Sequence, residues 1–480
     1  LVTDASRREK GVHSIYEFVN LGWDDTYFLD ITCRTDWSST LHPTKWSYTY
    51  PSVSASVLLD KAFKINTPYV NMLKVRASWA NVGNDTSPYS LYDAYSKTSL
   101  PGGFTLPSTL KDAYINPENV ESWEVGFEGK FLSNRLNFDV ALYKNTTTDQ
   151  ILGVSQSSET GATKVMMNAG RVENKGIEIS FRLRPVQTRD LLWEINGNWA
   201  RNKNKLCELN EGWDPSTPLQ TSMGVTIGSR TFVYSYIGEE MHWIYGRDYV
   251  RAPKGSTYTD ENGTVIDCSG MPIIDPKTGY PSLIEDPNQR IAKVNPDWKA
   301  GFGTSVRYKN LSFSAQFTAQ MGGNSFSVTN FALSYQGKLK NSLPGREDGL
   351  VLKGVNAVDN GDGTVSYNRN NTITENVYIY YNKYQWVRDN TKANTFSTDF
   401  LKLKEVRLDY RFPEKWMRKT GFLRSASLGV FATNLFCITN WPQYDPEAAG
   451  VVSGSNIYGG IETGSFPMTR TYGFNIKLQF

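Results

Sequence analysis

The stretch Met468-Thr-Arg-Thr-Tyr-Gly-Phe-Asn-Ile-Lys-Leu-Gln-Phe480 alternates between apolar and polar residues up to its last position. One face of an extended segment would carry Tyr472, Phe474, Ile476, Leu478 and Phe480. This period of two predicts a β-strand. A strand with one fully apolar face and an aromatic end is typical of a transmembrane β-barrel, where that face meets lipid. The edge strand of a soluble sandwich is the alternative.

The same alternation recurs along the chain, in segments 121–132, 135–145, 297–309 and 311–321. In 135–145, for example, Phe138 and Val140 share one face, while Asn137 and Asp139 share the other. A sandwich buries its apolar faces in a closed core, whereas a membrane barrel exposes them to lipid and lines a wet lumen with the polar faces. The alternation alone leaves both arrangements open.

The connections between the expected strands alternate in length, and this rhythm favours the barrel. Short connections are expected at 24–25, 60–72, 133–134, 185–190, 309–310 and 413–422, and long ones at 37–45, 84–120, 147–170, 204–296, 322–398 and 437–467. Transmembrane barrels have tight periplasmic turns and long outer loops. About thirteen strands are expected, and this odd number predicts a fragment of a larger barrel. The apolar positions change parity around Glu405, which predicts a β-bulge.

Aromatic residues are expected at both ends of the strands. Trp123, Trp199, Trp298 and Tyr472 would lie at the outer ends, and Trp193, Tyr308, Phe412 and Phe480 at the inner ends. Two aromatic girdles are typical of barrels, because such rings favour the headgroup layers. The alternative is that aromatics are simply good strand formers.

Composition narrows the possible functions. The chain has 480 residues with a net charge of +3, and no basic cluster interleaved with aromatics points to nucleic acid. No apolar run approaches the length of about 18 residues that a spanning helix needs. There are only three histidines, and no zinc, nucleophile-elbow or phosphate-loop motif occurs. We therefore expect no catalytic residues, no metal and no cofactor, and a protein that is not an enzyme.

Four cysteines are present. Cys207 and Cys268 share one long outer loop and could pair in an oxidising envelope, although two free thiols are the favoured interpretation. Cys33 and Cys437 are expected on or beside strands.

The longest outer loops are rich in Trp and Tyr, which suit sugar faces, peptides or a protein partner. The candidate ligand- or partner-binding residues are Trp243, Tyr245 and Arg247, with Tyr380 and Trp386 as a second choice. Two aromatics and a guanidinium follow each other on one side of an extended segment. Packing between loops is the alternative role for the rings, and a local ion pair with Glu239 or Glu240 is the alternative for Arg247.

Several motifs, taken in this order, resemble those of one family. They are Arg34-Thr-Asp-Trp-Ser-Ser39, Tyr50-Pro-Ser-Val-Ser54, Leu73-Lys-Val-Arg-Ala-Ser-Trp79, Asn116-Pro-Glu-Asn-Val-Glu-Ser-Trp-Glu124, Asn168-Ala-Gly-Arg-Val-Glu-Asn-Lys-Gly-Ile-Glu178, Asp445-Pro-Glu447 and the terminal strand. Through nearly its whole length the chain resembles the C-terminal barrel portion of SusC/RagA-type TonB-linked (TonB-dependent) outer-membrane transporters of Bacteroidetes.

The resemblance implies a twenty-two-stranded antiparallel barrel with a plugged lumen, of which residues 1–480 form the C-terminal portion. It also implies a signal peptide, a plug and a TonB-contacting segment that are absent from this chain, and a SusD-like surface lipoprotein as partner. The implied function is energy-coupled import across the bacterial outer membrane. An oligosaccharide is the favoured ligand and an oligopeptide the alternative. Alternatives from other functional classes are a passive porin, a loop-borne adhesin and a surface enzyme.

Overall fold

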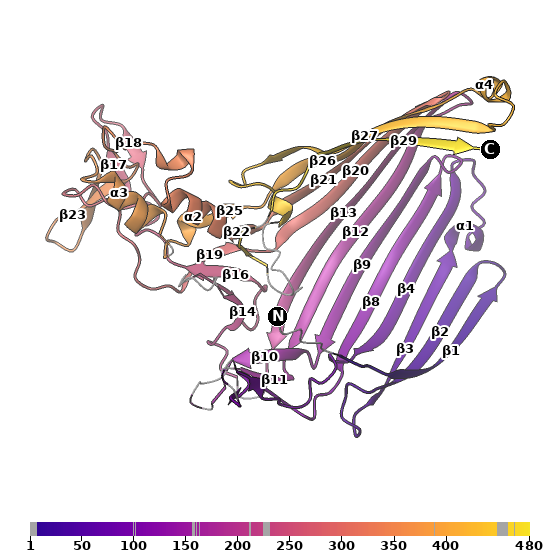
Figure 1. Cartoon of the computed structure of the whole chain (residues 1–480), viewed down its shortest axis with the longest axis horizontal. Coiled ribbons are helices and arrows are strands. Elements are labelled where there is room, and N and C mark those ends of the chain that lie inside the picture. The colour runs from indigo at the N-terminus through magenta and orange to yellow at the C-terminus, as the bar shows by residue number, and fades with distance from the viewer. Residues whose placement is uncertain are drawn as a thin grey trace.

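The computed structural model describes residues 7–98, 100, 102–155, 159, 161–162, 164–210, 213–223, 231–387, 389–448, 459–464 and 466–480. Its main feature is one antiparallel sheet of thirteen strands in chain order (Figure 1). They are β1 (Val12–Trp23), β2 (Tyr27–Ser38), β3 (Ser47–Leu58), β4 (Val70–Asn84), β8 (Glu118–Phe131), β9 (Leu136–Thr148), β12 (Arg171–Gln187), β13 (Leu191–Glu208), β20 (Pro296–Tyr308), β21 (Leu311–Gly322), β26 (Phe400–Arg411), β27 (Ser425–Thr439) and β29 (Thr471–Gln479). The expected all-β antiparallel fold is confirmed.

From β4 onward the connections alternate as expected between short turns and long excursions. The β2–β3 connection, 39–46, departs from the expectation, because it is shorter than the β3–β4 connection, 59–69. The tight ones, some with a short helix such as α1 (Leu59–Ala62) or α4 (Glu414–Arg418), lie at the end of the sheet where β29 finishes (Figure 1). The long ones lie at the opposite end. Small pieces of structure fill two of these, namely β5 (Ser96–Lys97), β6 (Phe104–Thr105), β7 (Thr109–Lys111), β10 (Ile151–Ser155) and β11 (Lys164–Asn168).

The predicted bulge lies in β26. Glu405 pairs with Gln316 and Leu403 pairs with Phe317, so Lys404 is the extra residue on this strand. The pairing of β26 with β27 shifts at the same place. One extra residue explains why the outward positions change from Leu401 and Leu403 to Val406 and Leu408.

The two faces of the sheet differ sharply in chemistry. On one face large apolar side chains are exposed, for example Phe474 at 71% and Leu142 at 53%. Continuous apolar surface of this extent is untypical of a water-facing protein and suits lipid. Among the rings expected at the strand ends, Trp123, Trp193 and Tyr472 are exposed on this face.

The other face carries networks of paired charges. The Arg76 guanidinium lies 2.5 Å from Asp139 and 3.2 Å from Glu124. Arg407 lies 2.6 Å from Asp409 and donates a hydrogen bond of 2.9 Å to Asn475. Such networks satisfy polar side chains on the side away from lipid, because a charge facing hydrocarbon has no partner.

Within the described residues the sheet does not close, since β1 pairs with β2 alone and β29 with β27 alone. The four cysteines are free thiols, as favoured for Cys207 and Cys268. Among the described residues no helix has the length and hydrophobicity needed to cross a bilayer.

Phe480, beside the end of β29, stacks on Phe422 of the β26–β27 connection with ring centroids 6.1 Å apart. Replacing Phe480 with Ala should cost about 0.5–1.5 kcal/mol of ring contact, besides the lost apolar area. We expect less heat-modifiable, folded protein in the outer membrane. Phe480→Trp should retain most of the parent yield, and an unchanged yield for Phe480→Ala would show that this contact is dispensable.

Candidate ligand- and partner-binding region

Three long connections pack together at one end of the sheet, and we call them the outer assembly. They are residues 209–295, 323–399 and 440–470, as far as these are described. The first forms a sheet of β14 (Leu219–Met223), β15 (Phe232–Ser235), β16 (Trp243–Gly246) and β19 (Gln289–Lys293). A second sheet joins β22 (Asn324–Ser327) and β25 (Thr395–Ser397) of the second connection to β28 (Ile461–Glu462) of the third. The assembly projects from the sheet beyond β20 and β21 (Figure 1).

Helices and hairpins complete the outer assembly. The helices are α2 (Val328–Tyr335), α3 (Val377–Tyr380), the π-helical turn Tyr381–Gln385, and 3-10 turns at Lys340–Ser342, Lys392–Asn394 and Pro446–Ala448. The hairpins are β17 (Thr257–Thr259) with β18 (Val265–Asp267), and β23 (Val355–Asp359) with β24 (Val365–Arg369). The β17–β18 connection contains Asn262-Gly263, and the β23–β24 connection contains both Asn360-Gly361 and Asp362-Gly363, which are typical hairpin-turn sequences.

A small apolar core holds the three connections together. Val233 and Ile244 of the first, Phe326 of the second and Ile461 of the third are each at most 2% exposed and in mutual contact. Because each connection contributes at least one buried side chain to the same core, the three connections pack on one another. The outer assembly is therefore one packed body and not three independent loops.

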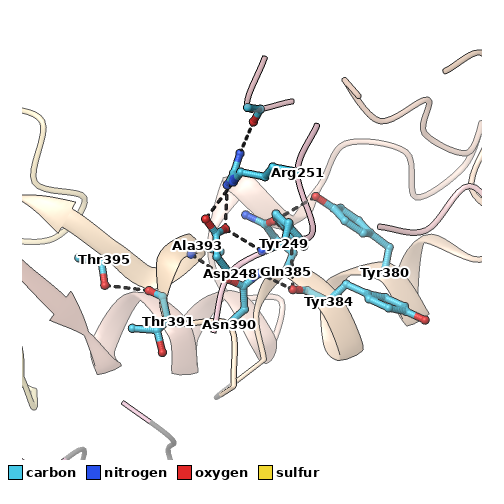
Figure 2. A network of polar contacts seen from close by, with 11 residues as sticks. Asp248, Tyr249, Arg251, Tyr380, Tyr384, Gln385, Asn390, Thr391, Ala393 and Thr395 are labelled. Carbon is cyan, nitrogen blue, oxygen red and sulfur yellow. Dashed lines mark hydrogen bonds and ion pairs between the residues drawn. The ribbon is translucent and has the colours of Figure 1, made fainter. Parts of the chain in front are cut away.

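Polar contacts reinforce the junction between the first two connections (Figure 2). Tyr249 and Tyr380 both direct their hydroxyls at the side-chain oxygen of Gln385, with Tyr380 at 3.1 Å. Burial raises the pKa of Tyr380 to about 12 and that of Tyr249 well above its ordinary value, so both hydroxyls keep their protons. Within the first connection, the guanidinium of Arg251 donates hydrogen bonds of 2.9 and 2.8 Å to the carboxylate of Asp248.

The structure places Trp243 and Tyr245 on β16. The guanidinium of Arg290 lies 3.6 Å from the centre of the Trp243 ring, a close cation–π contact. Tyr245 is 6% exposed and packs against Tyr234 and Tyr236 at 5.4 and 5.7 Å. Both rings therefore pack within the outer assembly.

Arg247 bridges two connections. Its guanidinium lies 3.7 Å from the carboxylate of Asp389, and its carbonyl accepts a hydrogen bond of 3.1 Å from the backbone N–H of Lys392. The alternative local pair with Glu239 or Glu240 is wrong. Glu239 lies 3.1 Å from Arg290, and Glu240 lies 3.6 Å from Lys293.

At the same junction, the backbone of the first connection at Gly246 lies close against the Thr391 side chain of the second connection. A side chain at Gly246 would collide with Thr391, whose hydroxyl bonds that of Thr231 at 2.9 Å. The second-choice residue Trp386 is 7% exposed and follows the π-helical turn. The five candidate residues thus belong to the same packed body, and among these five Tyr245 and Trp386 are buried.

A groove of about 660 Å³ opens in the second connection between α2 and α3. The rings of Tyr335 and Tyr378 border it and are 49% and 69% exposed. Arg346 also borders the groove, and its guanidinium donates to the backbone carbonyl and hydroxyl of Ser342 at 2.8 and 2.9 Å. Glu375 adds a carboxylate of opposite charge. Aromatic faces beside polar groups are typical of a ligand site.

Tyr335 and Tyr378 lie in one of the aromatic-rich outer loops, but the sequence gives no reason to prefer them over the other rings there. Their distinction is exposure, which depends on how α2 and α3 pack. A pattern of residue types carries no such signal.

The third connection is tied to the polar face of the sheet by a buried charge cluster. Lys402 of β26 is 1% exposed, and its ammonium lies 2.7 and 2.6 Å from the two carboxylate oxygens of Asp445. Glu447 also contacts Lys402 and lies 2.5 Å from Lys404. Burial would raise the pKa of Glu447, but the hydrogen bonds from the two lysines outweigh it and lower that pKa. The Asp445-Pro-Glu447 motif thus holds this connection to the sheet.

No group of three or more His, Cys, Asp or Glu side chains that could hold a metal ion occurs in the part of the chain that the structure describes. The arrangement offers aromatic surface, paired charges and a groove.

Comparison with known proteins shows which family has this architecture. Residues 2–340 match the family model described as TonB dependent receptor-like, beta-barrel. The TonB-dependent receptor P3 of Formosa agariphila is 25% identical, over 97% of this chain and 45% of its own length. The TonB-dependent receptor SusC of Bacteroides thetaiotaomicron is 24% identical, over 99% of this chain and 45% of its own. The solved structure of the RagAB peptide transporter has the same fold, with a TM-score of 0.74 at 19% identity, over 98% of this chain and 47% of that one.

The fold and the family match over most of the chain define a portion of an outer-membrane receptor β-barrel. The chain belongs to the TonB-dependent-receptor-like β-barrel family. This is a family of outer-membrane receptors and not of enzymes, and the expected family and location are confirmed. The chain spans about half the length of the curated relatives it matches.

Proposed function

We propose that this chain is the C-terminal portion of a twenty-two-stranded, plugged transporter that imports an oligomeric nutrient across the outer membrane. Residues 1–480 supply thirteen strands and the outer assembly. The remaining strands, the signal peptide, the plug and the TonB-contacting segment belong to a part of the protein outside this chain. If β1 and β29 remained edge strands in lipid, their outer backbone N–H and C=O groups would have no hydrogen-bond partners. This cost supports the proposal that further strands complete the barrel.

The observation that carries the proposal is the packed outer assembly on a sheet with one lipid-suited face. A plain pore needs only short loops around an open mouth, whereas this chain devotes three connections to a body with its own apolar core. Such a body can hold a ligand and dock a partner. A SusD-like surface lipoprotein is the proposed partner on the outer side, and the TonB complex on the inner side. Outer-membrane lipid surrounds the apolar face, and nucleic acid has no role.

An oligosaccharide is the favoured ligand. The exposed rings of Tyr335 and Tyr378 flank the groove, and hydroxyl-rich sugar rings stack on such faces while polar neighbours bind their hydroxyls. Asn376 and Asn382 border the same groove and supply amides.

An oligopeptide is the second candidate ligand. Arg346, Glu347 and Glu375 bring charges of both signs to the groove, which suits the termini and side chains of a peptide. The fold also resembles that of RagAB, which is named a peptide transporter. A passive porin or an adhesin would need no energy coupling, so dependence of uptake on the TonB complex separates them from an importer.

The first test concerns the groove. Tyr378→Ala should weaken uptake of the ligand about tenfold, equivalent to about 1.4 kcal/mol, because it removes an exposed contact ring. Tyr95→Ala is the matched control, since Tyr95 is 68% exposed in another long connection. Labelled oligosaccharides and peptides should be compared in cells with equal surface abundance. Equal uptake by both variants would remove the groove from the ligand site.

The second test concerns Trp243, Tyr245, Arg247, Tyr380 and Trp386, which we propose contribute to ligand or partner binding by shaping the outer assembly. Trp243→Ala and Arg247→Ala should lower uptake and co-purification of the lipoprotein, since each loosens a junction between elements. Arg290→Lys is the conservative control, because it keeps a cation near the Trp243 ring. If both alanine variants import and associate like the parent, these residues serve only loop packing.

A further inference from the structure

Six cationic side chains surround one cavity at the short-turn end of the sheet, far from the outer assembly. The cavity measures about 760 Å³ and lies among the β12–β13 turn, the β20–β21 turn and the β26–β27 connection. Its cations are Arg189, Arg307, Lys309, Arg411, Lys415 and Arg424. All six are exposed. The one acidic residue of the lining, Glu414, already pairs with Arg418 at 2.7 Å.

This positive charge is not balanced locally. Within the described part of the chain, none of the six cations forms an ion pair with a carboxylate. The whole chain has a net charge of only +3, so the excess is a local concentration. At physiological ionic strength charges interact over about 8 Å, and cations around one cavity therefore repel each other unless an anion lies between them. The cluster favours an anionic occupant.

The frame of the cavity is fixed by backbone hydrogen bonds. Asn310 and Arg411 exchange two bonds of 2.8 Å, one from the Asn310 side chain and one from the Arg411 backbone. The backbone N–H of Lys309 donates to the backbone carbonyl of Asp190 at 2.6 Å, and that of Arg424 donates to the backbone carbonyl of Gln479 at 2.7 Å. The cations thus project from a preformed rim.

Apart from Lys309, whose ammonium lies 5.3 Å from the centre of the Tyr308 ring, the cavity belongs to the polar side of the sheet. Arg307 and Arg411 lie on the face opposite to their neighbours Tyr308 and Tyr410, which are 53% and 36% exposed among the apolar side chains. A lipid headgroup would approach from the apolar face and is therefore disfavoured. Cations spread over three connections and the ends of β20 and β26 match several carboxylates better than one small anion.

We propose that this basic cavity is the seat of an acidic stretch of polypeptide, which lies across the inner mouth of the barrel. The stretch belongs to the part of the protein outside this chain, since the matched relatives are about twice as long. Carboxylates of the stretch bind the six cations, and Phe412 and Pro413 supply an apolar contact within the same lining.

The test is site-specific photocrosslinking in outer membranes that contain the whole protein. Lys415 is replaced by p-benzoylphenylalanine, and the crosslinked peptides are identified by mass spectrometry. Lys419 is the control position, because it is exposed on the same connection but outside the cavity lining. We expect an intramolecular crosslink from position 415 to a segment rich in Asp and Glu, with a yield severalfold higher than from position 419.

The second part of the experiment reverses the charge of two of the cations. Arg189→Glu with Arg411→Glu should reduce the crosslink severalfold, as should raising the salt concentration from 50 to 500 mM, whereas Lys419→Glu should leave it unchanged. A crosslink to lipid, to another protein or to a segment without acidic residues would overturn the proposal, as would no crosslink at all. The readout needs no transport, so it fails or succeeds independently of the proposed import. Heat modifiability of each variant verifies that the barrel has folded.

Discussion

Lys402→Met is expected to release the third connection of the outer assembly from the sheet, at a cost of about 3–5 kcal/mol. The Lys402 ammonium is 1% exposed and holds Asp445, which is itself 6% exposed. Removing the cation leaves a carboxylate buried without its counter-charge, and this penalty exceeds the value of the pair itself. Of the changes proposed here, this one should have the largest effect.

Limited proteolysis of intact cells measures the release, with cleavage sought between residues 440 and 448. Lys404→Met is the matched control on the same strand. Lys404 contacts Glu447 at 2.5 Å, but its side chain is 30% exposed, so its loss should cost at most about 1 kcal/mol. Equal protection of Lys402→Met and the parent protein would show that the cluster does not hold the connection.

A charge on the apolar face should be the next most damaging change. Phe317 of β21 packs on that face against Phe302 and Phe436, with ring centroids 6.1 and 6.5 Å apart. Phe317→Arg should cost about 2–4 kcal/mol if the position lies near the bilayer midplane. The measurement is the amount of heat-modifiable protein assembled in outer membranes.

The neighbouring variant Gln316→Arg is the control at the same depth on the opposite face. Gln316 is exposed and pairs in register with Glu405, so a new guanidinium there has an acidic neighbour and should be tolerated. Asn475 and Asp139 are less suitable controls, because they already bind Arg407 and Arg76. Equal assembly of Phe317→Arg and Gln316→Arg would contradict the assignment of the two faces.

The sheet could be predicted because its determinants are local. Side-chain direction in a strand has a period of two, so residues such as Phe474 and Asn475 reveal their faces without knowledge of their partners. Antiparallel neighbours joined by a tight turn also have a fixed register, as Lys309 and Asn310 illustrate between β20 and β21. Even the bulge at Lys404 leaves a sequence signal, since it changes the parity of the apolar positions.

The outer assembly could not be predicted in the same way, because its contacts join residues far apart in the chain. Arg247 has acidic residues nearby in sequence, yet it pairs with Asp389 of another connection. Trp386 is buried and Tyr378 is exposed. The local sequence does not distinguish them, because both lie in the same aromatic-rich stretch. Asp445 and Glu447 form a recognisable motif, but the sequence does not indicate their partner Lys402, because β26 and the third connection meet only in the folded protein.

Energy-dependent uptake tests most directly whether this chain forms part of an importer. Cells that carry the whole protein would be given labelled oligosaccharides and peptides, with and without a functional TonB complex. We expect saturable accumulation of one oligomer class that disappears when the TonB complex is removed. Uptake that continues without the TonB complex, or no uptake that depends on the protein, would contradict the proposed function.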